Sequence, residues 1–157
     1  MALLPARFGT DLHLMRNLDL THTSRDPGND LATRRRSGAS GVDLDILSGA
    51  DNLVQALLMR FLTPLGELEA LGHPDYGSRL FDLIGELNNE TTRNRAKLYV
   101  LQALALEPRV KSVVSVRVTQ NPSNRTQMDI DISLRVVDSD TPLNLVFPFF
   151  LERGRTP

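Results

Sequence analysis

The sequence has no cysteine and no tryptophan, and only 5 % of its 157 residues are aromatic. Without cysteine there is no disulfide framework and no thiolate nucleophile. No apolar run approaches the roughly 20 residues that cross a bilayer, and the N-terminus lacks a signal-peptide pattern. The formal net charge is −1, whereas nucleic-acid-binding domains are usually strongly basic. We therefore expect no membrane insertion, no nucleic-acid partner and a cytoplasmic origin. A protein that is assembled into a released particle would show the same features.

Motifs for metal binding and catalysis are also missing. The histidines, His13, His22 and His73, lie in separate segments, and none has a second His or Cys at metal-ligand spacing. The sequence contains neither a phosphate-binding glycine loop nor a Gly-x-Ser-x-Gly elbow. We predict no catalytic residue, no metal and no cofactor. Glycoside hydrolysis remains an alternative because it needs only two carboxyl groups, and Glu67 with a neighbouring carboxylate could supply them.

The length is that of a single domain, and the apolar periodicity predicts an α+β fold. Helices are expected over residues 50–62, 78–87 and 91–106, followed by antiparallel strands. The prediction is a three-helix N-terminal half packed on a small antiparallel sheet of C-terminal strands, with an extended N-terminal arm. Residues 1–48 would form the arm with a mobile Arg-rich loop, and residues 49–157 the α+β domain. Arg34–Arg36 lie in that loop, as solvated charges or as a phosphate or partner contact.

The C-terminal strands alternate apolar and polar residues. In the first strand Val110, Val114, Val116 and Val118 are expected to share the inner face. We expect Val116 to pair with Ile130 of the second strand, which sets Arg117 opposite Asp129. Pro148 cannot donate a ladder hydrogen bond, so the last strand should lie at a sheet edge. Its apolar residues are candidates for contact with a partner strand: Leu143, Leu145, Val146, Phe147, Phe149 and Phe150.

The segment Ala103–Val110, ALALEPRV, joins the last helix to the first of these strands. Pro108 disfavours helical geometry at Glu107, so the helix should end there. Residues 98–106 are apolar almost all round, and such a helix must be covered on all sides. Two interpretations stay open for Glu107 and Arg109: a solvated or locally paired charge couple, or charges that a rigid corner presents to a partner.

Several ordered motifs resemble the baseplate wedge family of contractile tails, which includes phage, type VI secretion and extracellular injection-system members. The similarity spans about residues 8–150. The matching elements are Asn52 and Gln55, the turn residues Gly66, Glu67, Pro74, Tyr76 and Gly77, and the corner Glu107, Pro108 and Arg109. The Arg-rich segment is not part of the pattern.

The resemblance implies a structural protein of a tail baseplate, not an enzyme. By this resemblance, Glu107, Pro108 and Arg109 dock onto the helical bundle of larger wedge proteins, and the last strand offers its edge to sheath subunits. Hub or spike proteins are further candidate partners. The alternatives are a lysozyme-like peptidoglycan glycosidase using Glu67, and a free-standing assembly adaptor. The particle would be a phage tail or an extracellular injection system.

Overall fold

The computed structural model describes residues 8–14, 32–35, 38, 41–137, 139 and 141–152. The chain divides into two compact units, Met1–Gln55 and Ala56–Pro157. The division falls inside helix α2 (Ala50–Phe61). Among the described residues, no helix combines the length and apolarity needed to cross a membrane. Arg36 and most of the predicted Arg-rich loop lie outside the described residues.

The first unit contains two small antiparallel sheets. Strand β1 (Thr10–Leu12) pairs with β4 (Ile46–Ser48), and β2 (Thr33–Arg35) pairs with β3 (Val42–Leu44). Every residue of β1, β2 and β3 is exposed. These strands therefore add backbone pairing but little buried apolar surface.

Two buried amides on α2 bind the backbone of the segment around β1. Asn52 Nδ2 donates to the Phe8 carbonyl at 2.7 Å. Gln55 donates through Nε2 to the Leu12 carbonyl and accepts through Oε1 from the Leu14 N–H, both at 2.8 Å. A buried amide that lost such partners would leave its donors and acceptors unsatisfied. The Asn and Gln of the sequence motif thus bind the N-terminal strand segment.

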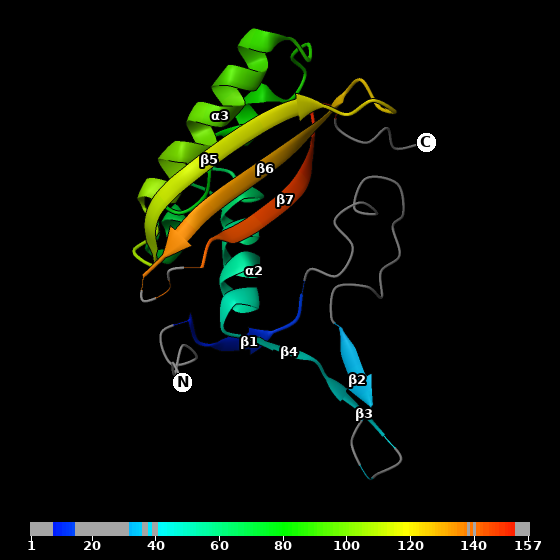
Figure 1. Cartoon of the computed structure of the whole chain (residues 1–157), viewed down its shortest axis with the longest axis vertical. Helices are drawn as coiled ribbons and strands as arrows, with labels where there is room; N and C mark the ends of the chain where they lie inside the picture. Colours follow the sequence, from blue (N-terminus) through cyan, green and yellow to red (C-terminus); the bar gives the residue numbers. More distant parts are fainter. Residues whose placement is uncertain are drawn as a thin grey trace. The chain divides into compact units, whose positions relative to one another are not determined.

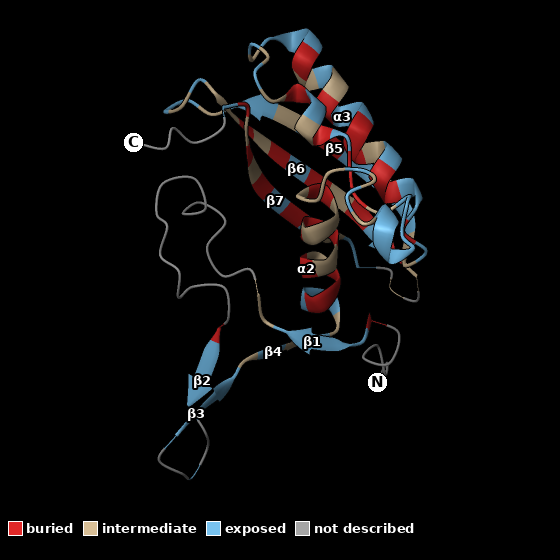
Figure 2. Cartoon of the chain, turned by 180° about the vertical axis from the view of Figure 1, so that it is seen from behind, coloured by how far each residue is buried: buried red, intermediate tan, exposed pale blue. Residues whose placement is uncertain are grey.

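The second unit is built on a three-stranded antiparallel sheet in the order β5-β6-β7 (Figure 1). The strands are β5 (Val110–Gln120), β6 (Gln127–Val136) and β7 (Leu143–Phe150), and helix α3 (Glu90–Ala105) packs beside β5. Buried and exposed residues alternate along β6 and β7 (Figure 2). The inner face holds Val116, Met128, Ile130, Ile132, Leu134, Leu145, Phe147 and Phe149.

The end of α2 contributes a large aromatic side chain to this core. Phe61 is fully buried and stacks on Phe147 with ring centroids 5.2 Å apart and planes within 6°. Stacked aromatic pairs add to the free energy of apolar burial. The predicted edge position of the strand that carries Pro148 is confirmed by the strand order.

The predicted three-helix half is wrong. The described part of the chain has two α-helices, α2 and α3, and strands form three small antiparallel sheets instead of one. The segment expected to be a helix over residues 78–87 forms only a short 3-10 turn, Leu80–Leu83. Ile84 is extended, and Gly85 donates its N–H to the Leu151 carbonyl after β7. Tertiary pairing with the end of the sheet thus overrides the helical periodicity, and Leu87 remains 81 % exposed.

The predicted register was wrong by two residues but had the right parity. Val116 pairs with Ile132 instead of Ile130, and Arg117 lies opposite Asp131. The expected inner face of β5 fails at Val114, which is 56 % exposed. Register shifts between Val110 and Ser112 and between Val113 and Ser115 mark β-bulges. Each bulge inserts one residue and inverts the alternation.

Helix α3 begins at the cap residue Asn89, whose side chain accepts from the Thr92 N–H at 2.9 Å. The helix buries one stripe of side chains: Thr92, Ala96, Tyr99, Val100, Ala103 and Leu104. Leu98 and Leu106 are about half exposed, at 51 % and 53 %. Within the part of the chain that the structure describes, the helix is therefore covered on one side only.

Candidate functional site

The second unit brings four side chains together near the ends of both helices, which we call the arginine cluster: Arg60, Tyr76, Glu107 and Arg109. Three segments far apart in the sequence supply them. Arg60 lies in the last turn of α2, Tyr76 in the following loop, and Glu107 and Arg109 between α3 and β5. Sequence motifs marked three of these residues, and the fold adds Arg60.

The corner of Glu107, Pro108 and Arg109 is a tight reversal of the backbone. The Glu107 N–H donates to the Leu104 carbonyl at 3.1 Å, which closes the end of α3. The Val110 N–H then donates to the Glu107 carbonyl, also at 3.1 Å, and starts β5. Helix α3 ends at Ala105. The prediction from Pro108 had placed the end of the helix at Glu107, two residues later.

Glu107 and Arg109 form a side-on ion pair inside this corner. Glu107 Oε1 accepts from Arg109 Nε at 2.6 Å, and Oε2 accepts from Nη2 at 3.1 Å. Oε1 also accepts from the Arg109 backbone N–H at 3.3 Å. The Glu107 side chain is 5 % exposed and that of Arg109 is 29 % exposed. The carboxylate is thus buried and locally paired, while its arginine reaches solvent.

The electrostatics of the pair keep both groups charged. Burial alone would raise the pKa of Glu107, but the Arg109 hydrogen bonds and the charges of Arg109 and Arg60 outweigh it and lower this pKa. The hydrogen bond to Glu107 raises the pKa of Arg109. The pair therefore stays ionised well below neutral pH.

Arg60 is the second cation of the cluster. Its Nη2 lies 3.7 Å from Glu107 Oε2, too far for a hydrogen bond. Its Cζ lies 4.7 Å from the centroid of the Tyr76 ring, in a cation–π contact. The side chain is 12 % exposed, and its Nε is buried with no hydrogen-bond partner in the described part of the chain.

Gly77 and Ser78 hold Tyr76 over Arg60. Ser78 donates its hydroxyl to the Phe61 carbonyl at 2.7 Å and its N–H to the Thr63 carbonyl at 2.9 Å, which fixes the loop to the end of α2. Gly77 has a φ of 113°, and a Cβ there would lie 2.7 Å from two carbonyl oxygens. Burial raises the pKa of Tyr76, against the opposing charge of Arg60.

The other residues of the motif turn do not join the cluster. Gly66 has a φ of 84° and supports the turn after α2. Glu67 and Pro74 are exposed. The motif thus combines residues that shape the loop with a single side chain, Tyr76, that contacts the charged cluster.

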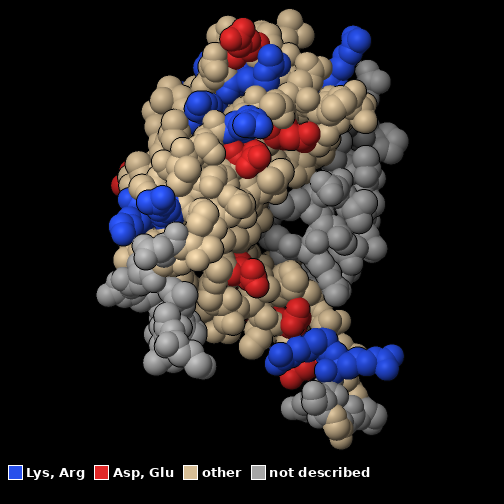
Figure 3. Space-filling model, in the orientation of Figure 1, with Lys and Arg blue, Asp and Glu red and all other residues tan. Residues whose placement is uncertain are grey.

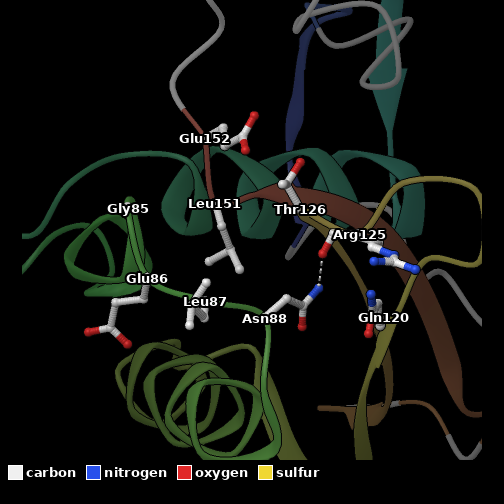
Figure 4. A pocket seen from close by; sticks show the side chains of 9 residues that line it. All are labelled: Gly85, Glu86, Leu87, Asn88, Gln120, Arg125, Thr126, Leu151 and Glu152. Carbon is white, nitrogen blue, oxygen red and sulfur yellow. Dashed lines mark hydrogen bonds between the residues drawn. The ribbon is translucent and has the colours of Figure 1, made fainter.

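A pocket of about 330 Å³ lies elsewhere in this unit, between the segment after the 3-10 turn and the β5–β6 hairpin. Asn88 lies in it and donates to the Arg125 carbonyl at 2.9 Å (Figure 4). Its carboxylates, Glu86 and Glu152, point away from one another in Figure 4, and Glu86 pairs with Arg95. Glu67 does not line the pocket. The pocket therefore lacks the converging pair of carboxyl groups that glycoside hydrolysis requires.

Strand β7, which was expected to contact a partner strand, places most of its apolar side chains in the core. Leu145, Phe147 and Phe149 are buried, Leu143 and Phe150 are half-buried, and Val146 is 63 % exposed. On the opposite face of the sheet, Arg117 faces Asp131, and acidic and basic side chains lie next to one another in the upper part of Figure 3. That face is locally charge-balanced.

In class, the second unit is a small α+β module: a three-stranded antiparallel sheet with helix α3 beside it and a charged corner between α3 and β5. The model of the contractile injection system sheath initiator family matches residues 28–138, and the chain belongs to that family. A crystal structure of a Geobacter sulfurreducens protein, provisionally described as a tail lysozyme, is 31 % identical with a TM-score of 0.59. The match covers 69 % of this chain and 97 % of that chain. No curated protein matches the chain.

Family membership confirms the resemblance to contractile-tail baseplate proteins and a structural role in such a tail. No sequence pattern singled out Arg60, which occurs in an amphipathic helix where an arginine in the last turn is common. The signal that identifies it is spatial: it lies beside Glu107 and under Tyr76.

Proposed function

We propose that this chain is a non-enzymatic baseplate protein that binds larger wedge proteins through Glu107, Pro108 and Arg109 and receives sheath subunits at the edge of β7. The family assignment supports the setting. The geometry of Arg109 is the observation that carries the docking role.

The guanidinium group of Arg109 has two hydrogen-bonding edges, and Glu107 binds one of them. A guanidinium carries five N–H donors in a plane. Nε and one Nη2 donor are directed to the buried carboxylate, so three donors remain on the far edge. With the side chain 29 % exposed, that edge is held in a fixed direction toward solvent. A fixed guanidinium binds carbonyl or carboxylate oxygens of a partner with little loss of side-chain entropy.

The edge of β7 supports the sheath contact. The Leu151 N–H donates to the Thr126 carbonyl on the β6 side. Because backbone groups alternate along an antiparallel strand, those of Asn144, Val146 and Pro148 point toward the open edge. Pro148 has no N–H, so Asn144 and Val146 are the donors that the part of the edge before Pro148 offers to an added strand. We propose that a sheath strand pairs with this N-terminal half of β7.

The test is incorporation of tagged variants into purified particles, measured by quantitative mass spectrometry. The double variant Glu107→Gln/Arg109→Gln removes both charges of the pair and leaves no unpaired buried carboxylate. We expect it to remain folded, as checked by thermal unfolding, and to be lost from particles. Arg135→Gln, an exposed change on β6, is the control and should be incorporated normally. Incorporation of the double variant at the wild-type level would refute the docking proposal.

A further inference from the structure

We infer that Arg60, supported on the ring of Tyr76, receives a carboxylate side chain from the protein that docks on the arginine cluster. This inference rests on the proposed function and adds the chemistry of the partner group. It assigns a role to a residue that no sequence motif includes.

The first observation is that Arg60 has unused hydrogen-bond donors in a place where water is largely excluded. Its side chain is 12 % exposed, and its Nε is the buried side-chain nitrogen without an acceptor in the described residues. Buried charged groups are normally paired and hydrogen-bonded, since desolvation otherwise opposes burial. Within the described residues, Arg60 has one charged neighbour, Glu107, but no hydrogen-bond acceptor. Because Nε is buried, the donors that a partner can reach are those of the Nη groups.

The contacts that Arg60 does make leave its donors unspent. The Arg60 Cζ lies over the Tyr76 ring, 4.7 Å from its centroid. The ring face carries no oxygen or nitrogen acceptor, so this contact gives the N–H groups of Arg60 no conventional hydrogen bond. Glu107 approaches only to 3.7 Å, and its two oxygens already accept from Arg109. Arg60 is therefore preorganised but unsatisfied.

The charge of the cluster indicates which group would satisfy it. Arg60 and Arg109 are two cations, and Glu107 is the only anion among the four side chains. A further carboxylate would neutralise the excess cation and supply acceptors for the Nη groups of Arg60. A neutral carbonyl would supply an acceptor but leave the charge. Charge complementarity thus favours an aspartate or glutamate of the partner.

The experiment compares stability and incorporation for Arg60→Met, which keeps the length of the side chain and removes the charge. If the charge serves a partner, the isolated variant should melt at or above the wild-type temperature while its incorporation into particles falls at least tenfold. Arg60→Lys keeps the charge and should retain part of the incorporation. If Arg60→Met melts at a lower temperature than wild type, and its depletion from particles only matches this loss of stability, Arg60 has a structural role and the inference is refuted.

A photo-crosslinker identifies the partner group. Replacing Tyr76 with p-benzoyl-phenylalanine keeps an aromatic ring over Arg60, and crosslinked peptides are sequenced from assembled particles. We expect a peptide of another baseplate protein that contains Asp or Glu. Neutralising that residue should lower incorporation of wild type but not of Arg60→Met. A crosslink to a second copy of this chain, or to a peptide without an acidic residue, would refute the inference.

The outcomes separate this inference from the docking proposal. If Arg60→Met is incorporated normally while Glu107→Gln/Arg109→Gln is lost, the carboxylate inference fails and docking through the corner stands. If both variants are incorporated normally, both fail. If both are lost and Arg60→Met keeps its melting temperature, both are supported.

Discussion

Replacing Glu107 with glutamine should destabilise the isolated chain markedly, although the side chain keeps its size. Glutamine removes the charge that faces Arg109 and presents an NH₂ group to one of two guanidinium donors. Breaking a buried ion pair from one side costs about 3–5 kcal/mol. Because Arg109 is 29 % exposed and partly screened by water, we take the lower end, about 3 kcal/mol. At roughly 2–4 °C per kcal/mol for a chain of this size, the melting temperature should fall by roughly 6–12 °C.

The same variant makes a prediction about pH. The pKa of Glu107 lies below its ordinary value of 4.5 in the folded chain, so the folded state binds fewer protons than the unfolded state. Its contribution to stability is therefore complete above pH 4.5 and is lost as the pH falls through the folded pKa. Urea unfolding at a series of pH values should show the wild type and Glu107→Gln converging on the acid side.

The matched control is Glu67→Gln, the same chemical change at an exposed carboxylate. It should alter the free energy of unfolding by less than about 0.5 kcal/mol and add no such convergence. A loss below about 0.5 kcal/mol for Glu107→Gln, or a difference from wild type that does not shrink in acid, would refute the buried-pair argument.

Two further substitutions test the scaffold by urea unfolding. Gly77→Ala should lower the free energy of unfolding by about 2–4 kcal/mol, because the added Cβ would lie 2.7 Å from two carbonyl oxygens at a φ of 113°. In the control Gly72→Ala, at a φ of 85°, the added Cβ meets no non-neighbouring atom within 4 Å, and the loss should be about 1–2 kcal/mol. Equal losses in the two variants would contradict the role of the close contact. Phe147→Ala should lower the free energy of unfolding by about 3–5 kcal/mol, because it leaves a cavity beside Phe61. Val146 is exposed on the same strand, so Val146→Ala should change this free energy by less than about 0.5 kcal/mol. Similar losses for both variants would show that the stacked pair is not the core of this unit.

Alternation predicted the strands because their inner residues face one continuous core. The apolar residues that alternate with polar ones along β6 are all buried: Met128, Ile130, Ile132, Leu134 and Val136. The same rule failed in β5 at Val114, where a bulge inverts the alternation without any glycine or proline to announce it. Helical periodicity gave a wrong prediction over residues 78–87, where the Gly85 N–H donates to the Leu151 carbonyl instead of continuing a helix. Contacts between residues distant in sequence leave no local pattern.

The candidate site was predictable to the extent that proline and glycine fix the backbone. Residue type alone indicated a corner at Pro108, and a glycine at position 77 suits the positive φ that the backbone has there. The partners of Glu107 were not predictable, because residue types do not show whether a carboxylate two residues before an arginine is solvated or paired. Arg60 was unpredictable for a further reason: its environment is made by a loop residue, Tyr76, that the Ser78 hydrogen bonds place over it.

Local pairing and partner binding, the two interpretations of the corner, do not exclude one another. A solvated Arg109 would lose rotamer freedom on docking, and that entropy would weaken the contact. Glu107, itself buried and bound to the Arg109 backbone, removes this freedom during folding. The rotamer entropy of Arg109 is thus lost during folding, and the ion pair holds the outer edge of the guanidinium in place before a partner binds. A glutamate that no partner could reach would thus be required for the arginine that a partner binds.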